Sequence, residues 1–416
     1  MWLSQRRVFL FSSRYFLSFR RKAVLSVRRV RPIRPTVWKF WVFFAFMIAM
    51  KKSTKTLAKR RLLVTRFPLE ARMGGEEVHT FTLMERLRGR GYKTYFLGSC
   101  PVLLFGEWDG KRRAWLGKPP VTKIWLVLFT VMSPVLFILS GFYLWRARRK
   151  WKVDTLYCLS FGEKLMMTPW GRIFGMKVLW LEHARIGRWL RGNPWRIWYS
   201  FLSRFVTVVV TSRAMATKVP AKNVVATSCG VELEKSRPLR KEILSFLKGG
   251  FGVGTVCRLT VDKGVDKIVR LVDTEPDMRL VLVGSGPLLS AIESSKNRDR
   301  ILHVDSLARG ELTSLYKALD VFILGSTEFD PFGMVAAEAM MAGTATVVTR
   351  ECGISFDLKN GREAMVVGAG FAEMDKAVRK LRDSRLREKI GKAGKKFAKE
   401  HYSIERMVEE FVRLLE

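Results

Sequence analysis

Cysteine is scarce in this sequence, and the few cysteines are not grouped. The 416 residues contain five of them, at positions 100, 158, 229, 257 and 352, and no two form a CxxC pair. An odd and scattered set argues against a disulfide framework and against a zinc site, and it is typical of free thiols in a reducing compartment. The same scatter gives little support to a cysteine nucleophile.

Acidic residues are also scarce when compared with basic ones. The chain has 37 Asp and Glu against 75 Lys and Arg, a net charge of +38, and residues 1–61 contain no acid at all. Removing that segment leaves +21 on residues 62–416. Such an excess attracts phosphate, whether in nucleic acid, in anionic lipid headgroups or in a phosphorylated substrate. The hydrophobic fraction of 48% excludes a disordered polymer, and the length favours two domains.

Residues 1–58 are predicted to be a basic and hydrophobic N-terminal extension. Arginine clusters alternate there with Phe, Leu and Val, and residues 40–50 form an apolar run too short to span a bilayer as a helix. Three interpretations remain open: a basic membrane-surface anchor, an uncleaved signal anchor, or an upstream extension from a misassigned start codon, with Met47 or Met50 as the natural start.

From residue 59 onward, short apolar runs alternate with helical patterns, as in a doubly wound parallel sheet. Expected strands lie at residues 61–67, 92–97, 155–159, 177–181 and 205–210, and a second series lies at 254–258, 279–283, 301–304, 321–324 and 346–348. We therefore predict an α/β protein with two Rossmann-like domains facing a cleft, residues 59–235 and 250–385. A hinge is expected near 235–250, and helices at 386–416 are expected to cross back to the first domain.

The segment 326–343, STEFDPFGMVAAEAMMAG, contains two acids, Asp330 and Glu338, separated by a Pro-Phe-Gly turn and a helix-forming run. A helix that begins near Gly333 would direct its free N–H groups toward the loop of Asp330 and toward an oxygen-rich ligand. The spacing alone is equally compatible with an N-capping Asp and a surface Glu.

This run resembles the E-x7-E segment of the family-4 retaining glycosyltransferases, which have the GT-B fold. The family form is E-P-F-G, four residues, then E-A-M-A-x-G, so Asp330 replaces the first Glu, and Glu328 is placed to compensate. The resemblance implies that Asp330 contacts the transferred sugar and that Glu338 holds the ribose, both as catalytic-site residues. It also implies donor contacts from the residues of the turn: Phe332, Gly333, Met334 and Val335.

Two further segments resemble donor-binding elements of that family. Residues 255–264, TVCRLTVDKG, place Arg258 and Lys263 where the family has G-R-L…K-G. Fixed cations at that place stabilise the charge of the leaving diphosphate without a metal ion; one unit-charge pair at about 4 Å is worth roughly 4 kcal/mol at an effective dielectric near 20. Residues 281–287, VLVGSGP, match the family's Gly-x-Gly-Pro turn and assign Gly284 and Gly286 to the donor site. The third glycine of GxGxxG is missing, which counts against an oxidoreductase.

The first half carries weaker matches to the same family. Gly74 and Gly75 precede a predicted helix at 76–90 and resemble the family's glycine loop, with Glu77 and His79 following. His183 ends a predicted strand, where the family often places a catalytic histidine; a structural role is the equal alternative. Residues 229–232, CGVE, stand where the family has N-G-V-D.

Residues 124–145 form an uncharged run with tryptophans at both rims, inside a hydrophobic insert at 121–150. A single span would place Gly74 and Gly75 on the opposite side of a membrane from Arg258 and Lys263, although both pairs are needed in one cleft. The remaining alternatives are a dipping hairpin broken at Ser133 and Pro134, a helix in the interface, and a buried core helix. We expect monotopic or peripheral association.

Taken together, these features predict a retaining, metal-independent hexosyltransferase that uses a UDP- or GDP-sugar as co-substrate and needs no other cofactor. Its expected acceptor is a lipid- or polyprenyl-linked or cell-envelope glycan at the anionic cytoplasmic face of the cell membrane. No metal site and no nucleic-acid partner are expected. The alternatives are an enzyme with a soluble acceptor, a sugar epimerase on the same sheet pair, a basic nucleic-acid-binding protein, and an inactive membrane scaffold.

Overall fold

The computed structural model describes residues 60–67, 75–116, 122–183 and 192–416. The predicted extension at residues 1–58 and Gly74 of the predicted glycine loop lie outside these ranges. All described residues fall within one compact unit of the chain, residues 53–416.

The first domain is built on a parallel seven-stranded sheet in the order β3-β2-β1-β4-β5-β6-β7. Most of its strands are apolar on both faces, as expected when helices cover both sides of a parallel sheet. The strands are β1 (Arg61–Arg66), β2 (Lys93–Gly98), β3 (Gly110–Arg113), β4 (Thr155–Cys158), β5 (Lys177–Glu182), β6 (Thr207–Val210) and β7 (Val224–Ala226).

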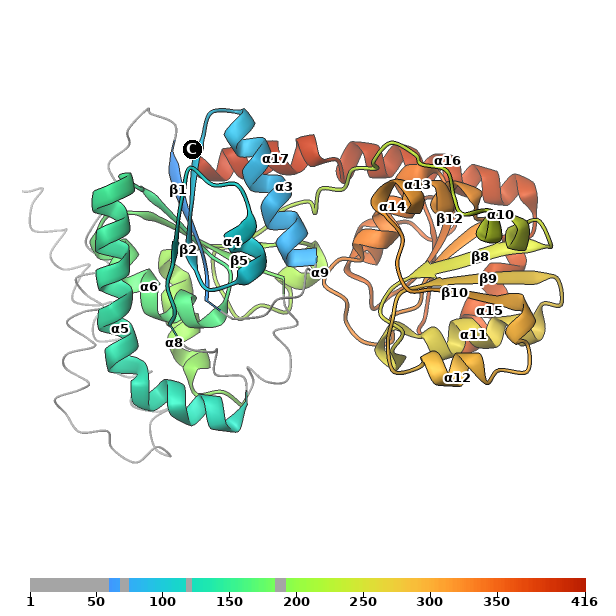
Figure 1. Cartoon of the computed structure of the whole chain (residues 1–416), viewed down its shortest axis with the longest axis horizontal. Helices are drawn as coiled ribbons and strands as arrows, with labels where there is room; N and C mark the ends of the chain where they lie inside the picture. Colours follow the sequence, from blue (N-terminus) through green and yellow to red (C-terminus); the bar gives the residue numbers. More distant parts are fainter. Residues whose placement is uncertain (1–59, 68–74, 117–121, 184–191) are drawn as a thin grey trace, which may run out of the picture. The chain divides into compact units, whose positions relative to one another are not determined.

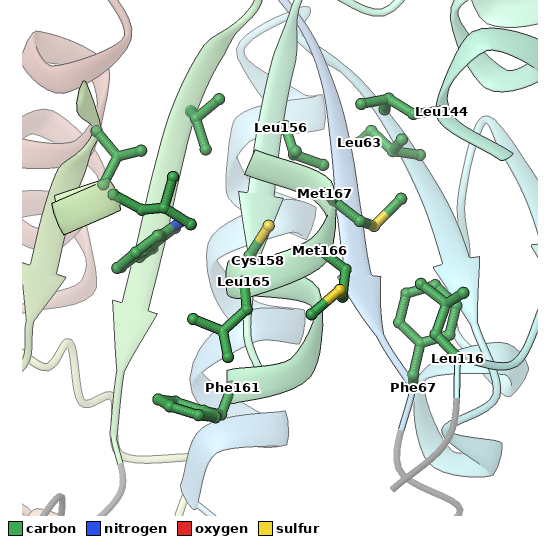
Figure 2. Close-up of a cluster of buried hydrophobic side chains, with 14 of the residues drawn as sticks. Leu63, Phe67, Leu116, Leu144, Leu156, Cys158, Phe161, Leu165, Met166 and Met167 are labelled. Carbon is green, nitrogen blue, oxygen red and sulfur yellow. The ribbon is translucent and has the colours of Figure 1, made fainter. Parts of the chain in front are cut away.

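Two helix layers cover this sheet (Figure 1). One contains α5 (Lys123–Trp151), α6 (Phe161–Ile173) and α8 (Trp195–Leu202); the other contains α3 (Gly75–Gly89) and α4 (Pro101–Phe105), joined by the C-terminal α17 (Ile404–Leu415). Figure 2 shows Met166 and Met167 of α6 in the cluster that also holds Leu63 of β1. Leu62 and Val64, the neighbours of Leu63, belong to the opposite core because strand side chains alternate between faces.

The second domain repeats this plan with six parallel strands in the order β10-β9-β8-β11-β12-β13. Its strands are β8 (Phe251–Val256), β9 (Met278–Val283), β10 (Ile301–Val304), β11 (Val321–Leu324), β12 (Ala345–Thr349) and β13 (Met365–Val367). One face is covered by α10 (Lys241–Leu247), α13 (Arg309–Ala318), α14 (Met334–Ala342) and α16 (Ser384–His401), and the other by α11 (Val265–Thr274), α12 (Leu289–Glu293) and α15 (Phe371–Lys380). The short helices α9 (Arg213–Ala216), η1 (Ser203–Phe205), η2 (Val261–Lys263), η3 (Arg298–Arg300) and η4 (Gly353–Asp357) complete the described elements.

The chain crosses between the domains twice, and the two crossings pair with each other. The backbone N–H of Val231 donates to the carbonyl of Tyr402 over 2.8 Å. After Tyr402 the chain enters α17, whose Phe411 packs edge-on against Tyr157 of the first domain, 5.3 Å between ring centroids. The C-terminal helix therefore returns to the first domain. Because Leu239 and Ile243 are part of the second core and the N–H of Arg237 donates to the carbonyl of Gly310 over 3.0 Å, the first crossing ends before residue 237.

The hydrophobic insert is one continuous helix, α5, which excludes the hairpin among the three alternatives for this segment. Pro134 cannot donate to the carbonyl of Thr130, but the Ser133 hydroxyl donates to it instead, over 2.8 Å. The helix bends rather than breaks (Figure 1). On its inner face, Gly141 leaves room for the ring of Trp170 of α6, whose indole N–H donates to the carbonyl of Phe137 over 2.8 Å. In this arrangement α5 is a structural layer of the first domain.

Candidate active site

A cavity of about 340 Å³ lies between the domains, at the carboxyl ends of both sheets. It brings together most of the predicted site residues, from both halves of the chain. The first domain and the following crossing contribute Gly75, Glu76, His183, Thr211 and Cys229. The second domain contributes Val256, Cys257, Arg258, Lys263, Leu324, Asp330, Pro331, Phe332, Gly333, Met334 and Val335.

Asp330 and Lys263 form an ion pair in this cavity. Their side chains are only 12% and 15% exposed, and Asp330 also accepts from the Ser326 hydroxyl over 3.4 Å and from the backbone N–H of Phe332 over 3.4 Å. The acid is therefore held in one orientation at the end of the loop that follows β11. The two residues were assigned to sugar and diphosphate separately, and their direct contact was not foreseen.

Arg258 follows β8 and extends into solvent, with 71% of its side chain exposed and its Nη2 3.8 Å from the carboxylate of Asp262. The backbone on either side of it is fixed by two glycines of the next loop. A Cβ on Gly284, whose φ is +135°, would lie 1.9 Å from the carbonyl oxygen of Cys257, and a Cβ on Gly286 would lie 2.4 Å from that of Leu259. Both glycines were predicted to contact the donor; in the structure they hold the Arg258 segment in place and do not line the cavity.

The helix α14 begins immediately after Gly333, as predicted, and Gly333 has φ +98°, a conformation that favours glycine. Glu338 lies on this helix outside the residues that line the cavity. Its carboxylate accepts from the hydroxyl of Tyr316 on α13 over 2.9 Å, and burial raises the pKa of Glu338 above its usual value. Tyr316 was not identified from the sequence, because its contact depends on the packing of two helices.

On the first-domain wall of the cavity, His183 lines the cavity and packs against a second, buried histidine, His79. The rings of His79 on α3 and His183 after β5 meet edge to face with centroids 4.7 Å apart, and the Cys229 thiol lies 3.6 Å from Nδ1 of His79. Burial lowers the pKa of His183 to about 3, with Lys164 and Arg66 acting in the same direction. His183 is therefore neutral at pH 7. Its Nε2 has no hydrogen-bond partner among the described residues.

Beneath the histidines lies a layer of buried ion pairs that sequence reasoning missed. Arg66, at the end of β1, contacts Glu76 and Glu77 at 2.7 Å each, which fixes the start of α3. Lys164 of α6 contacts Glu182 of β5 at 2.8 Å. A charged residue inside an apolar strand or helix is a signal for such a pair, but its partner is apparent only in the fold.

No group of three or more His, Cys, Asp or Glu side chains within the described ranges is arranged to hold a metal ion. The charged residues that line the cavity are Glu76, Arg258, Lys263 and Asp330, and the start of α14 lies beside them.

Residues 238–397 match the family model described as glycosyl transferases group 1. This part of the chain is a glycosyl transferases group 1 domain. It includes the whole second sheet and every cavity-lining residue of the second domain.

Curated relatives match the chain over part of their length. Mannosylfructose-phosphate synthase of Agrobacterium fabrum is 33% identical over 124 residues, which cover 26% of this chain and 27% of the relative. A GDP-mannose-dependent alpha-(1-6)-phosphatidylinositol dimannoside mannosyltransferase of Mycobacterium tuberculosis is 27% identical over 222 residues, which cover 47% of this chain and 55% of the relative. The matched region thus spans about a quarter to about half of the length of these relatives.

Solved structures match the fold over both domains. The HepE protein of Anabaena in complex with UDP and glucose has a TM-score of 0.68 at 16% identity, covering 86% of this chain and 99% of that one. Sucrose-phosphate synthase of Thermosynechococcus elongatus has a TM-score of 0.66 at 17% identity, covering 86% and 98%. The predicted GT-B fold, two parallel-sheet domains with the group 1 domain as the second, is confirmed.

Proposed function

We propose that this protein is a retaining, metal-independent glycosyltransferase that moves a hexose from a UDP- or GDP-sugar to a lipid-linked acceptor. The observation that carries the proposal is the cavity in which Arg258, Lys263, Asp330 and the start of α14 meet on a group 1 domain. These are two cations, one acid and a helix N-terminus, which together suit a nucleoside diphosphate attached to a sugar.

The cations would act on the leaving group. As the bond to the sugar breaks, negative charge grows on the diphosphate, and a cation fixed about 4 Å away is worth roughly 4 kcal/mol at an effective dielectric near 20, before desolvation. Arg258 is solvent-exposed in the free protein and available for a phosphate. Lys263 is paired with Asp330, so donor binding would bring the diphosphate and the sugar to opposite ends of an existing ion pair.

The first-domain wall would contribute a neutral polar group. His183 keeps an uncharged ring beside the cavity, and its Nε2, which has no hydrogen-bond partner among the described residues, suits a sugar hydroxyl better than it suits a phosphate. We assign Asp330 to the transferred sugar and Glu338 to the ribose, the latter after a side-chain movement that exchanges the Tyr316 hydroxyl for the ribose hydroxyls.

Two comparisons support the donor and the acceptor class. The HepE complex contains UDP and glucose, and the mycobacterial relative is named for GDP-mannose and a phosphatidylinositol dimannoside. A lipid acceptor also agrees with α5, which is long and apolar enough to cross a membrane. Only 22% of the most apolar part of this helix is buried inside the protein. Because its inner face is packed on α6, we propose that α5 lies along the cytoplasmic leaflet rather than across it.

The proposal is tested by donor hydrolysis. Purified protein should slowly release UDP or GDP from one member of a nucleotide-sugar panel without acceptor, and EDTA should not change the rate. NMR of the product with a lipid acceptor should show the anomeric configuration of the donor. No release with any donor would favour an inactive scaffold. Loss of activity in EDTA with recovery in manganese would disprove metal independence, and full transfer to soluble sugars without lipid would favour the soluble-acceptor alternative.

A further inference from the structure

A second, smaller hollow of about 180 Å³ lies on the first domain, between the edge strand β3 and the C-terminal half of α5. Its lining combines three cationic side chains with two aromatic rings, and it shares no residue with the cavity between the domains. The cations are Arg112, Arg146 and Lys150, and the rings are Tyr143 and Trp151. Lys111 also borders the groove, but its ammonium donates to the carbonyl of Leu104 over 2.7 Å, on the opposite face of the sheet. We call it the β3–α5 groove.

The groove contains no acid to balance these cations. None of the residues lining it is Asp or Glu, and none of the three cations forms an ion pair with any residue that the structure describes. Nearby cations behave differently: Lys93 pairs with Asp109 at 2.9 Å, and Arg88 pairs with Glu107 at 3.1 Å. Three like charges gathered around one hollow repel one another, and an anion bound between them would relieve that repulsion.

The groove continues the exposed apolar face of α5. Ile138 and Phe142 are 67% and 48% exposed, and Arg146 and Lys150 follow them at the same four-residue spacing along the helix. Residues four apart lie on one helix face, so this face changes from apolar to cationic between Phe142 and Arg146. A ligand that matches the change must carry an apolar part beside a negatively charged one.

Resting on the proposed membrane docking of α5, we infer that the β3–α5 groove binds the phosphate of an anionic phospholipid headgroup. The acyl region of the same leaflet covers the apolar face of α5. The aromatic rings at the groove suit the boundary between headgroups and acyl chains, where tyrosine and tryptophan are enriched. The groove would therefore fix which end of α5 sits at headgroup level.

The test compares two charge-removing double variants of the full chain in vesicle sedimentation. Arg112→Gln with Lys150→Gln removes two groove cations, and Lys396→Gln with Lys399→Gln removes two exposed lysines from α16 of the second domain. Vesicles are phosphatidylcholine alone or mixed with phosphatidylglycerol. The groove variant should lose roughly thirtyfold in affinity for the mixed vesicles, because each basic residue near an anionic surface contributes about fivefold. The control variant should stay within about twofold.

Further measurements separate this inference from the proposed membrane docking and the proposed activity. Thermal melting and donor hydrolysis should be unchanged in the groove variant, since it alters no cavity residue. Ile138→Asp with Phe142→Asp should abolish binding to both vesicle types. If that change abolishes binding while the groove variant binds normally, docking stands and the groove assignment is wrong. Equal losses in the groove and control variants would show unspecific attraction and overturn it as well.

A last arm addresses the source of the phosphate. In calorimetry, short-chain phosphatidylglycerol should bind the wild type more tightly than inorganic phosphate does, and removal of the groove cations should eliminate that difference. Equal affinity for the two would mark the groove as a phosphate site and disprove the lipid assignment. Failure of donor hydrolysis in the wild type would bear only on the glycosyltransferase proposal.

Discussion

The two walls of the central cavity differ in how they handle charge. On the second-domain wall, Lys263 and Asp330 pair at the surface of the cavity, and Arg258 extends freely into solvent. On the first-domain wall, the Glu76 carboxylate lines the cavity but is paired with the buried Arg66, the Lys164–Glu182 pair is buried, and His183 is neutral. From this difference we propose that the second-domain wall binds the charged nucleotide and that the first-domain wall binds the uncharged hydroxyls of the acceptor.

Loss of Lys263 should have the largest effect on both turnover and stability. Lys263→Met should reduce turnover about a thousandfold by removing a cation beside the leaving group. It should also destabilise the protein by about 3–5 kcal/mol, because the Asp330 carboxylate stays buried without its partner. Donor hydrolysis and chemical denaturation measure the two effects.

The matched control for this variant removes both charges. Lys263→Met with Asp330→Asn leaves no unpaired carboxylate, so it should recover part of the lost stability while remaining inactive. If the double variant is less stable than the single one, the ion pair is not the source of the effect.

Loss of Arg258 should affect catalysis and leave the fold intact. Arg258→Ala removes a solvent-exposed side chain, so stability should change by less than about 0.5 kcal/mol, whereas turnover should fall about 100- to 1,000-fold. Arg350→Ala is the control, since Arg350 is also exposed and lies outside the cavity lining. Similar rates in the two variants would remove Arg258 from the donor site.

The donor side of this picture could be predicted from sequence because its chemistry lies in short segments. Arg258, Lys263 and the turn before α14 are each set by a few neighbouring residues, so a motif places them. The Lys263–Asp330 pair joins residues far apart in sequence, and it appears only when the loops after β8 and β11 come together. Gly284 and Gly286 show a further limit, because a sequence does not reveal whether a glycine makes room for a ligand or for backbone.

The first domain was predicted less well from the sequence than the second, because its key contacts depend on tertiary packing. The hairpin alternative assumed that Pro134 would break the helix, but the neighbouring Ser133 hydroxyl donates to the carbonyl of Thr130 that Pro134 leaves without its backbone donor. The contact between His79 and His183 depends on how α3 packs on the sheet. Buried pairs such as Lys164 with Glu182 need the complete topology before the partner is known.

The neutral state of His183 can be tested by measuring stability at different pH values. With a folded pKa of about 3 against an ordinary value of 6.5, His183 stabilises the protein above pH 6.5, and this contribution is lost as the pH falls. Between pH 6.5 and pH 5 the loss should be about 2 kcal/mol. Glu163 has the opposite sign, because burial raises its pKa to about 7 and favours the fold at low pH.

The measurement must therefore be a difference between two proteins. Denaturation of wild type and His183→Gln at pH 7 and pH 5 cancels Glu163, and the variant should lose about 2 kcal/mol less than wild type on acidification. An NMR titration of the His183 ring with a midpoint near 6.5 would show that burial does not lower the pKa of His183.

The smallest expected effect concerns Glu338, which belongs to the donor side but lies beyond the cavity lining. If its carboxylate exchanges Tyr316 for the ribose, Glu338→Gln should weaken nucleotide binding about tenfold, the usual loss for one hydrogen bond to a charged group. Tyr316→Phe removes the competing hydroxyl and leaves the acid in place, so it should bind nucleotide at least as tightly as wild type. Calorimetry with UDP and GDP measures both. Equal weakening by the two variants would instead mean that the Tyr316–Glu338 bond only braces α13 against α14, and the charged wall of the cavity would then end at Asp330.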